Sequence, residues 1–260
     1  MEVNDLFNGQ QFSMFIVLAL TVTVLMMVQR ARSGLKIPKI RRLAGLDAID
    51  EAIGRATEMG RSVIYFPGRG ALNNAQTLAA FAVLGYVGRS CARYDTKLIA
   101  CSYAAPVYSV MEGIVRDSFL SSGKEDRYDQ TIVRFMGSGW GATSSSSQGV
   151  IRREKAAACL YIGAWYADTM MLADAGALLG AIQVGGTAEI AEIPYIVAAC
   201  DYALICEEIF AAGAYLSEDS APKANLVALD YFKIAAVLLL CLGVLLETVG
   251  TSWFTGFTTR

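Results

Sequence analysis

The stretch VIYFPGRGALNNAQTLAAFAVLGYVGR (residues 63–89) contains, in order, a short apolar run, a loop of small residues and a helical stretch. The run VIYF is β-prone and holds no charged residue, which is typical of a strand in a parallel sheet that is covered on both faces. The loop at residues 67–74 ends the strand, and a helix is expected near residues 73–93. A strand followed by a helix in this way is the building unit of α/β folds.

The same unit recurs along the chain. Further β-prone runs lie at residues 97–102, 131–136, 181–184 and 202–206, and further helical stretches lie near residues 106–121, 150–173 and 188–199. An amphipathic helix opens the domain, because apolar residues recur at three- and four-residue steps: Leu46, Ile49, Ile53 and Ala56. Right-handed crossovers connect such units, so the sequence predicts an α/β fold with a mostly parallel sheet of about five strands covered by helices.

The composition excludes most familiar catalytic and metal sites. The 260-residue chain contains no histidine, which excludes a Ser-His-Asp triad, a Cys-His pair and histidine-ligated zinc or iron. Its six cysteines are scattered without a C-x-x-C motif, and small buried side chains in a reducing compartment are their simplest interpretation. We expect no metal, no cofactor and no enzymatic activity.

Two catalytic arrangements that need no histidine stay open. Ser102 or one of the serines at residues 144–147 gives a Ser–Lys pair if it lies beside Lys155. Glu207 or Glu208 gives a general base if burial raises its pKa. Neither arrangement has a recognisable sequence motif.

Two apolar segments near the chain ends predict a membrane protein. An apolar fraction of 55% exceeds the roughly 45–50% of soluble domains. Residues 12–28 are 17 residues without a charge, the lower limit for crossing a bilayer core. Six lysines and arginines follow within residues 30–42, so the positive-inside rule places the N-terminus outside and the next domain in the cytoplasm.

The second expected span contains an acidic residue. It covers residues 234–253, and the lysines that precede it again place the middle of the chain in the cytoplasm. Glu247 inside this span predicts a helix–helix contact in an oligomer or an ion relay. The alternative is that the span ends early and Glu247 lies among the lipid headgroups.

These segments divide the chain as a two-pass protein of the cytoplasmic (inner) membrane. The expected parts are a short extracytoplasmic tail (1–11), a transmembrane helix (12–29), a basic juxtamembrane segment (30–44), a cytoplasmic α/β domain (45–222), a linker (223–233), a second transmembrane helix (234–253) and an extracytoplasmic tail (254–260).

Four loops that follow expected strands are rich in small residues. They lie at residues 67–74, 102–109, 137–149 and 185–192, and the carboxyl ends of parallel strands bring such loops to one edge, where α/β folds bind ligands. Small residues let the backbone approach a ligand closely, and helix N-termini offer amide groups to an anion. Arg69 is the only cation in the four loops.

These loops predict a site for a small anion or a nucleotide. Its expected contacts are Gly68, Arg69, Gly70, Gly137, Gly139, Gly185, Gly186 and Thr187. The alternative is that tight turns and close loop packing need the same small residues. Gly137, Gly139 and Ala142 match the G-x-G-x-x-G/A spacing of dinucleotide-binding turns, but they follow the third expected strand instead of the first, and no acidic residue ends the next strand.

The segment at residues 156–222 contains no lysine or arginine. Its nine acidic residues are Asp168, Asp174, Glu189, Glu192, Asp201, Glu207, Glu208, Glu218 and Asp219. Unopposed carboxylates repel phosphates, so we expect no nucleic-acid partner. An acidic surface also fits the basic segment of a neighbouring copy, or simply a solvated face.

The stretch GAIQVGGTAEIAEIPYIVAACDYALICEEIFAAGAYLS (residues 180–217), with FPGRG (residues 66–70), resembles an uncharacterised family of bacterial membrane-anchored proteins, known as a domain of unknown function. The resemblance brings no catalytic residue and no ligand. The expected function is therefore a membrane-anchored scaffold or docking subunit, whose partners are the lipid bilayer, other subunits and copies of itself. The alternative function is the anion- or nucleotide-binding module.

Overall fold

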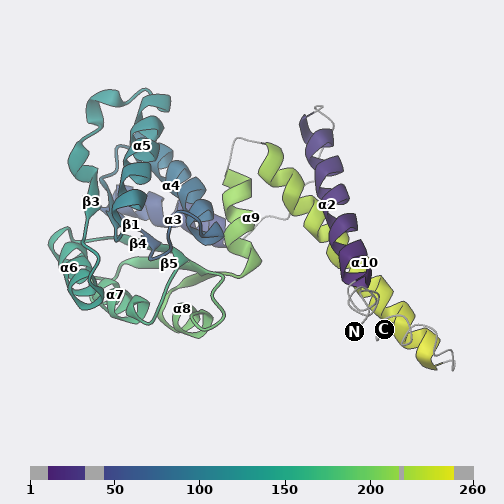
Figure 1. The fold of residues 1–260 in the computed structure, drawn as a ribbon. Helices are drawn as coiled ribbons and strands as arrows, with labels where there is room; N and C mark the ends of the chain where they lie inside the picture. The colour runs from purple at the N-terminus through teal and green to yellow at the C-terminus, as the bar shows by residue number, and fades with distance from the viewer. Residues whose placement is uncertain (1–10, 33–43, 217–219, 249–260) are drawn as a thin grey trace. The chain divides into compact units, whose positions relative to one another are not determined.

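The computed structural model of the chain describes residues 11–32, 44–216 and 220–248. Two compact units make up the chain. One unit, Arg41–Glu218, is an α/β domain, and the other combines the terminal segments Met1–Ile40 and Asp219–Arg260 (Figure 1).

The α/β domain is built around one sheet. Within the described residues the sheet has six strands: β1 (Val63–Gly68), β2 (Leu98–Ser102), β3 (Val133–Phe135), β4 (Ala158–Ala164), β5 (Ile182–Thr187) and β6 (Tyr202–Ile205). The helices are α3 (Ala44–Glu58), α4 (Ala75–Tyr94), α5 (Ala105–Ser121), α6 (Trp140–Arg153), α7 (Asp168–Ala177), α8 (Ile193–Ala199) and α9 (Glu207–Leu216), with two short 3₁₀ helices, η1 (Glu125–Arg127) and η2 (Gln130–Ile132).

The strand order reverses once across the sheet. The order is β3-β2-β1-β4-β5-β6, and every neighbouring pair is parallel. The chain therefore winds outward from β1 to β3, returns to the other side of β1 with β4, and winds outward again. In open α/β sheets the crevice at such a reversal, outside the carboxyl ends of the strands, is where ligands bind.

Helices cover both faces of the sheet (Figure 1). Alternate strand residues point to opposite faces. Val63 and Tyr65 of β1 pack in a core with residues of α3, α4, α5 and α9. Ile64 and Phe66 pack in a second core with residues of α6 and α7. The expected parallel sheet with helices on both faces is confirmed, and so is the opening helix, because α3 buries Ile49 and Ile53.

The strand that sequence analysis missed is β4. A helix was expected over residues 150–173, whereas α6 ends at Arg153, β4 occupies the middle and α7 begins at Asp168. Lys155 interrupts the helix with a φ of 49°. The run ACLYIGA is continuously apolar, and such a run fits a buried helix as well as a buried strand. All seven of its residues are buried in the structure.

The terminal segments contribute two helices that lie side by side, α2 (Gln11–Arg32) and α10 (Ser220–Thr248) (Figure 1). In the parts of the chain that the structure describes, no helix is both long enough and apolar enough to cross a membrane. This finding contradicts the expected spans at residues 12–29 and 234–253, and with them the expected two-pass membrane localisation.

The physical reason lies in the length of the uninterrupted apolar runs. A spanning helix needs about 20 consecutive, mostly apolar residues. The run in α2 is 17 residues and includes Thr21 and Thr23, and the run in α10 is the 13 residues between Lys233 and Glu247. The predicted span in α10 reaches the required length only if Glu247 and the residues after it are included.

Two further expectations fall on α10 and its ends. Residues 223–233, expected as a linker, lie within this helix. Glu247 lies in its last turn, but the Glu247 side chain and residues 249–260 are outside the described part of the chain.

Candidate functional site

The backbones of β1 and β4 touch where the strand order reverses. The pairing of the two strands shifts register between Phe66 and Gly68, and the amide of Arg69 donates to the carbonyl of Ala164 at 2.7 Å. Gly68 has a φ of 78°, and a Cβ on it would collide with the backbone of Ala164. Glycine is therefore needed here for its backbone freedom and for the close approach.

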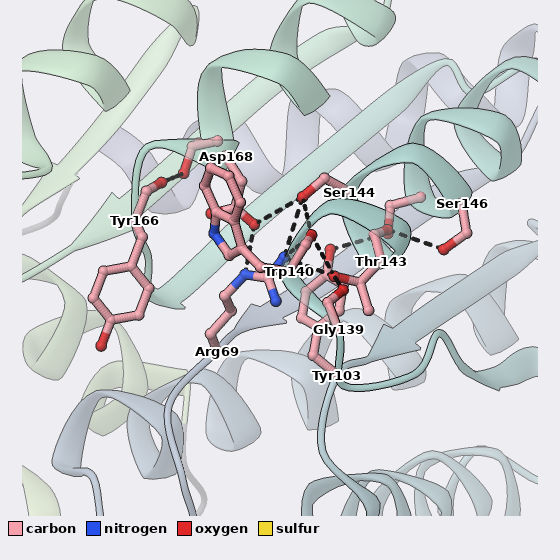
Figure 2. Close-up of polar contacts among 11 residues, drawn as sticks. Arg69, Tyr103, Gly139, Trp140, Thr143, Ser144, Ser146, Tyr166 and Asp168 are labelled. Carbon is pink, nitrogen blue, oxygen red and sulfur yellow. Dashed lines mark hydrogen bonds and ion pairs between the residues drawn. The ribbon is translucent and has the colours of Figure 1, made fainter.

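Polar contacts with α6 and α7 hold the side chain of Arg69 at the carboxyl edge of the sheet. Its Nε donates to Asp168 Oδ2 at 2.6 Å, and its Nη2 donates to Thr143 Oγ1 at 2.8 Å and to Ser144 Oγ at 3.2 Å. Nη2 also lies 3.3 Å from the carbonyl oxygen of Trp140. Figure 2 shows these dashed contacts converging on one guanidinium from α6 and from the start of α7.

The ion pair of Arg69 and Asp168 is almost removed from solvent. The two side chains are 10% and 0% exposed. Asp168 Oδ1, the second carboxylate oxygen, has no hydrogen-bond partner among the described residues. A buried carboxylate is stabilised only when its charge is paired and its lone pairs are satisfied.

An aromatic cluster lies beneath the guanidinium. The Cζ atom of Arg69 is 4.6 Å from the centre of the Tyr103 ring, a cation–π distance. Phe66 stacks with Tyr103 and Tyr161, and Trp165 meets all three rings edge-on. Burial raises the pKa of the Tyr103 hydroxyl, which lies within hydrogen-bond distance of Ser147 Oγ. The packed rings of this cluster thus support the guanidinium of Arg69 from one side.

The connection after β5 contacts the first turn of α4. Gln76 Oε1, in the first turn of α4, accepts from the amide of Ala188 at 2.8 Å, and the amide of Glu189 donates to Thr187 Oγ1 at 3.1 Å. Glu192 follows and is buried. Burial, and then the negative charges of Asp168 and Glu189, raise the pKa of Glu192.

Four buried polar side-chain atoms have no hydrogen-bond partner within the described residues. They are Thr77 Oγ1, Trp165 Nε1, Asp168 Oδ1 and Glu192 Oε2. Thr77 belongs to the first turn of α4, Trp165 and Asp168 to the connection after β4, and Glu192 to the connection after β5. All four thus lie on the carboxyl side of the sheet, three of them after β1 and β4 and Glu192 after the neighbouring strand β5. Buried polar groups without partners mark places where a ligand, an ion or a water binds.

The structure brings together only some of the expected ligand residues. Gly68, Arg69 and Gly70 lie at the strand reversal, and Gly139 is the N-cap of α6, whose first turn Arg69 contacts. Gly137 begins the same loop with a φ of 92°. Thr187 ends β5 and is buried.

Gly185 and Gly186 do not lie in a loop, in contrast to the expectation from the sequence. They lie inside β5, not in the loop after it. A Cβ on Gly185 would lie 2.6 Å from Ile196 Cγ2, and a Cβ on Gly186 would lie 3.1 Å from Ile162 Cδ1. Both positions fit the packing alternative, because a helix and neighbouring strand residues occupy the space of their side chains.

Thr143, Asp168 and Glu192 were not predicted as site residues, and Ser144 was considered only as a member of a Ser–Lys pair. Asp168 was assigned to an acidic face, but it is buried and paired with Arg69. Recognising residues 158–164 as a strand would have placed Asp168 at the carboxyl edge, which is the signal that was available. Ser144 is separated from Lys155 along the helix, since Ser144 lies in the first turns of α6 and Lys155 follows the opposite end of that helix.

Comparison with known proteins identifies a family. The family described as Domain of unknown function (DUF6754) matches residues 2–258. Comparisons with curated proteins and with solved structures give no match. The family match confirms the resemblance to an uncharacterised family drawn from residues 66–70 and 180–217, but it shows neither a bacterial origin nor a membrane anchor. Because it covers nearly the whole chain, this chain belongs to the family Domain of unknown function (DUF6754).

Proposed function

We propose that the α/β domain is a binding module for a small anion, held at the carboxyl edge between Arg69 and the first turn of α6. The observation that carries the proposal is the position of Arg69: it lies at the strand reversal, and its guanidinium contacts the N-terminal turn of a helix. Ligands of open α/β sheets bind at this place.

The start of α6 adds uncapped amide groups. Helix α6 has 14 residues, and its N-cap, Gly139, provides no side-chain hydrogen bond. The first amide groups of a helix lack internal partners and carry partial positive charge, so they favour an anion. Residues 139–142 are exposed, which leaves these amides accessible.

Asp168 lowers the net charge of the site but holds the guanidinium in place. Within the described residues, the hydrogen bonds of Arg69 use Nε and Nη2. Nη1 therefore keeps its donors for an anion. A donor that is already ordered loses little side-chain entropy when it binds.

The amide of Trp140 provides the sharpest test. Gly139 has φ −78° and ψ 126°, which suits a residue that precedes proline, and proline is tolerated as the first residue of a helix. Trp140→Pro therefore deletes one amide N–H, whereas the control Trp140→Ala keeps it. Calorimetric titration with inorganic phosphate and methyl phosphate should show binding to the wild type and to Trp140→Ala.

Trp140→Pro is expected to bind about tenfold more weakly, as loss of one hydrogen bond to a charged group predicts. Arg69→Lys should weaken binding as well, because lysine lacks the planar set of donors. Arg61→Lys is the matched control, because Arg61 precedes β1 at the opposite edge and donates to the carbonyl oxygens of Lys155 and Ala156. Equal affinity in all five proteins contradicts the proposal.

A second candidate function is a docking subunit that assembles through α2 and α10. The two helices lie side by side, yet Val17, Leu18, Leu238 and Val244 are 60–67% exposed. Clustered exposed apolar side chains mark association surfaces. We propose that these helices bind the same helices of other copies.

Light scattering after size-exclusion chromatography tests this second function. The wild type should be larger than one chain, and Leu18→Glu with Leu238→Glu should reduce it to a monomer. Leu178→Glu is the control, because Leu178 is a 70% exposed leucine of the α/β domain. A monomeric wild type contradicts the docking function.

A further inference from the structure

The polar groups at the carboxyl edge form a row with two chemically different ends. At one end, the first turn of α6 and the guanidinium of Arg69 offer donors. At the other end, Asp168 and Glu192 offer carboxylate oxygens that have no partner within the described residues. Arg69 joins the two ends, since Nη2 contacts Thr143 and Nε contacts Asp168 (Figure 2).

Contacts between neighbouring loops hold this row together. A Cβ on Gly70 would collide with Thr77 Oγ1 and would lie 3.2 Å from the Ala164 Cβ at the end of β4. Gln76, next to Thr77, accepts from the amide of Ala188 after β5. The first turn of α4 therefore lies beside the loop after β1 and contacts the connection after β5, which leads to Glu192.

Resting on the anion site proposed above, we propose that the same ligand carries hydroxyl groups, which bind at the Asp168 and Glu192 end of the row. The ligand class is a hydroxylated phosphate ester, such as a sugar phosphate, instead of an inorganic anion. Its phosphate contacts Arg69 and the start of α6, and its hydroxyl groups donate to the two carboxylates.

The mixture of unpartnered atoms favours hydroxyl groups over an ammonium group. The two carboxylate oxygens need donors, whereas the indole N–H of Trp165 needs an acceptor. A hydroxyl group donates and accepts, but an ammonium group only donates. An ammonium group would therefore leave the buried Trp165 N–H without a partner, which costs free energy.

Exposed aromatic side chains at the rim fit the same class. Trp140 is 57% exposed and Tyr166 is 55% exposed. Both flank the ion pair of Arg69 and Asp168 (Figure 2). Aromatic faces supply apolar contact area that a bare phosphate cannot use but the carbon skeleton of a sugar can.

Calorimetric titration of the full chain with ribose 5-phosphate and with methyl phosphate tests the inference. Both probes carry a phosphate ester, but methyl phosphate has no hydroxyl on its carbon. Ribose 5-phosphate should bind the wild type at least tenfold more tightly, since hydrogen bonds to charged groups contribute about a factor of ten each. Glu192→Gln should lose this preference and keep its affinity for methyl phosphate.

Matched variants separate the role of Glu192 from general effects. Glu189→Gln changes an exposed carboxylate of the same loop and should keep the preference. Thr77→Val preserves the side-chain shape, removes another unpartnered oxygen and should reduce the preference even if Glu192→Gln does not fold. Equal affinity of the wild type for both probes, or an unchanged preference in Glu192→Gln and Thr77→Val, overturns the inference alone. No binding of either probe overturns the anion site and the inference together.

Discussion

Arg69 Nε lies 2.6 Å from Asp168 Oδ2, and this ion pair ties the loop after β1 to the start of α7. The pair connects the segments that follow β1 and β4, the two strands between which the sheet reverses its order. Residues 99 positions apart in the sequence thus meet at the place where the topology opens a crevice. The ion pair that organises the candidate site therefore also holds the loop after β1 against the start of α7.

Removing one partner of this pair should destabilise the domain strongly. Asp168→Ala leaves the guanidinium of Arg69 buried without its carboxylate, which typically costs about 3–5 kcal/mol. Urea unfolding measures the loss. The control is Arg127→Ala, which breaks the pair with Asp95 whose side chains are more than half exposed; such a pair contributes about 1 kcal/mol or less. Similar losses in both variants contradict the central role of Arg69 and Asp168.

A methyl group at Gly185 should test whether this glycine serves packing. Its Cβ would lie 2.6 Å from Ile196 Cγ2 and 2.8 Å from Cys200 Sγ, so Gly185→Ala should lower the free energy of unfolding by about 1–3 kcal/mol. Gly141→Ala is the control, because nothing lies within 4 Å of its Cβ position in α6, and alanine favours a helix by up to about 1 kcal/mol. Unchanged stability of Gly185→Ala, combined with weaker phosphate binding, speaks for a ligand role instead.

The parts of the fold that depend on local pattern were predictable. The apolar steps of α3 predict its buried face, and VIYF followed by small residues predicts β1 and its loop. Arg69 was identified because it is the only cation in the four expected loops. Its place at the edge then follows from the parallel sheet, since such loops meet at the carboxyl ends.

The parts of the fold that depend on tertiary context were not predictable from the sequence. The run ACLYIGA has no period that separates a strand from a helix, and without β4 neither the strand reversal nor the role of Asp168 could be seen. Gly185 and Gly186 were placed in a loop because glycine is a weak strand former. Only the packing of Ile196 and Ile162 against them explains why β5 contains both.

The buried cysteines should resist alkylation. Burial raises the pKa of Cys91, Cys101 and Cys159 to about 12, and the thiolate is the reactive form. Iodoacetamide at about pH 8 should modify the exposed Cys241 and leave these three unmodified, as mass spectrometry of peptides will show. In urea all of them should react. Fast native labelling of Cys159 would contradict its place in the central strand.

Two glutamates should give the domain opposite responses to pH. Hydrogen bonding to Lys97, and then to Arg134, lowers the pKa of Glu154 in spite of partial burial. Its stabilisation is present above the unfolded pKa of about 4.3 and is lost as the pH falls through the lower folded value. Glu154→Gln should therefore be less stable than the wild type near neutral pH, and this difference should shrink in acid.

The pKa of Glu192 is shifted in the opposite direction, so its effect on the pH dependence of stability has the opposite sign. Burial and the charges of Asp168 and Glu189 raise its pKa, so between the unfolded value and the raised folded value the folded state binds more protons than the unfolded state. Stability then falls as the pH rises through that window. Glu192→Gln removes this loss, so it should gain stability relative to the wild type as the pH increases from about 4 to 7. Urea unfolding of the wild type and both variants across this range measures the two slopes. Slopes of the same sign for Glu154→Gln and Glu192→Gln would show that burial and the neighbouring negative charges do not raise the pKa of Glu192.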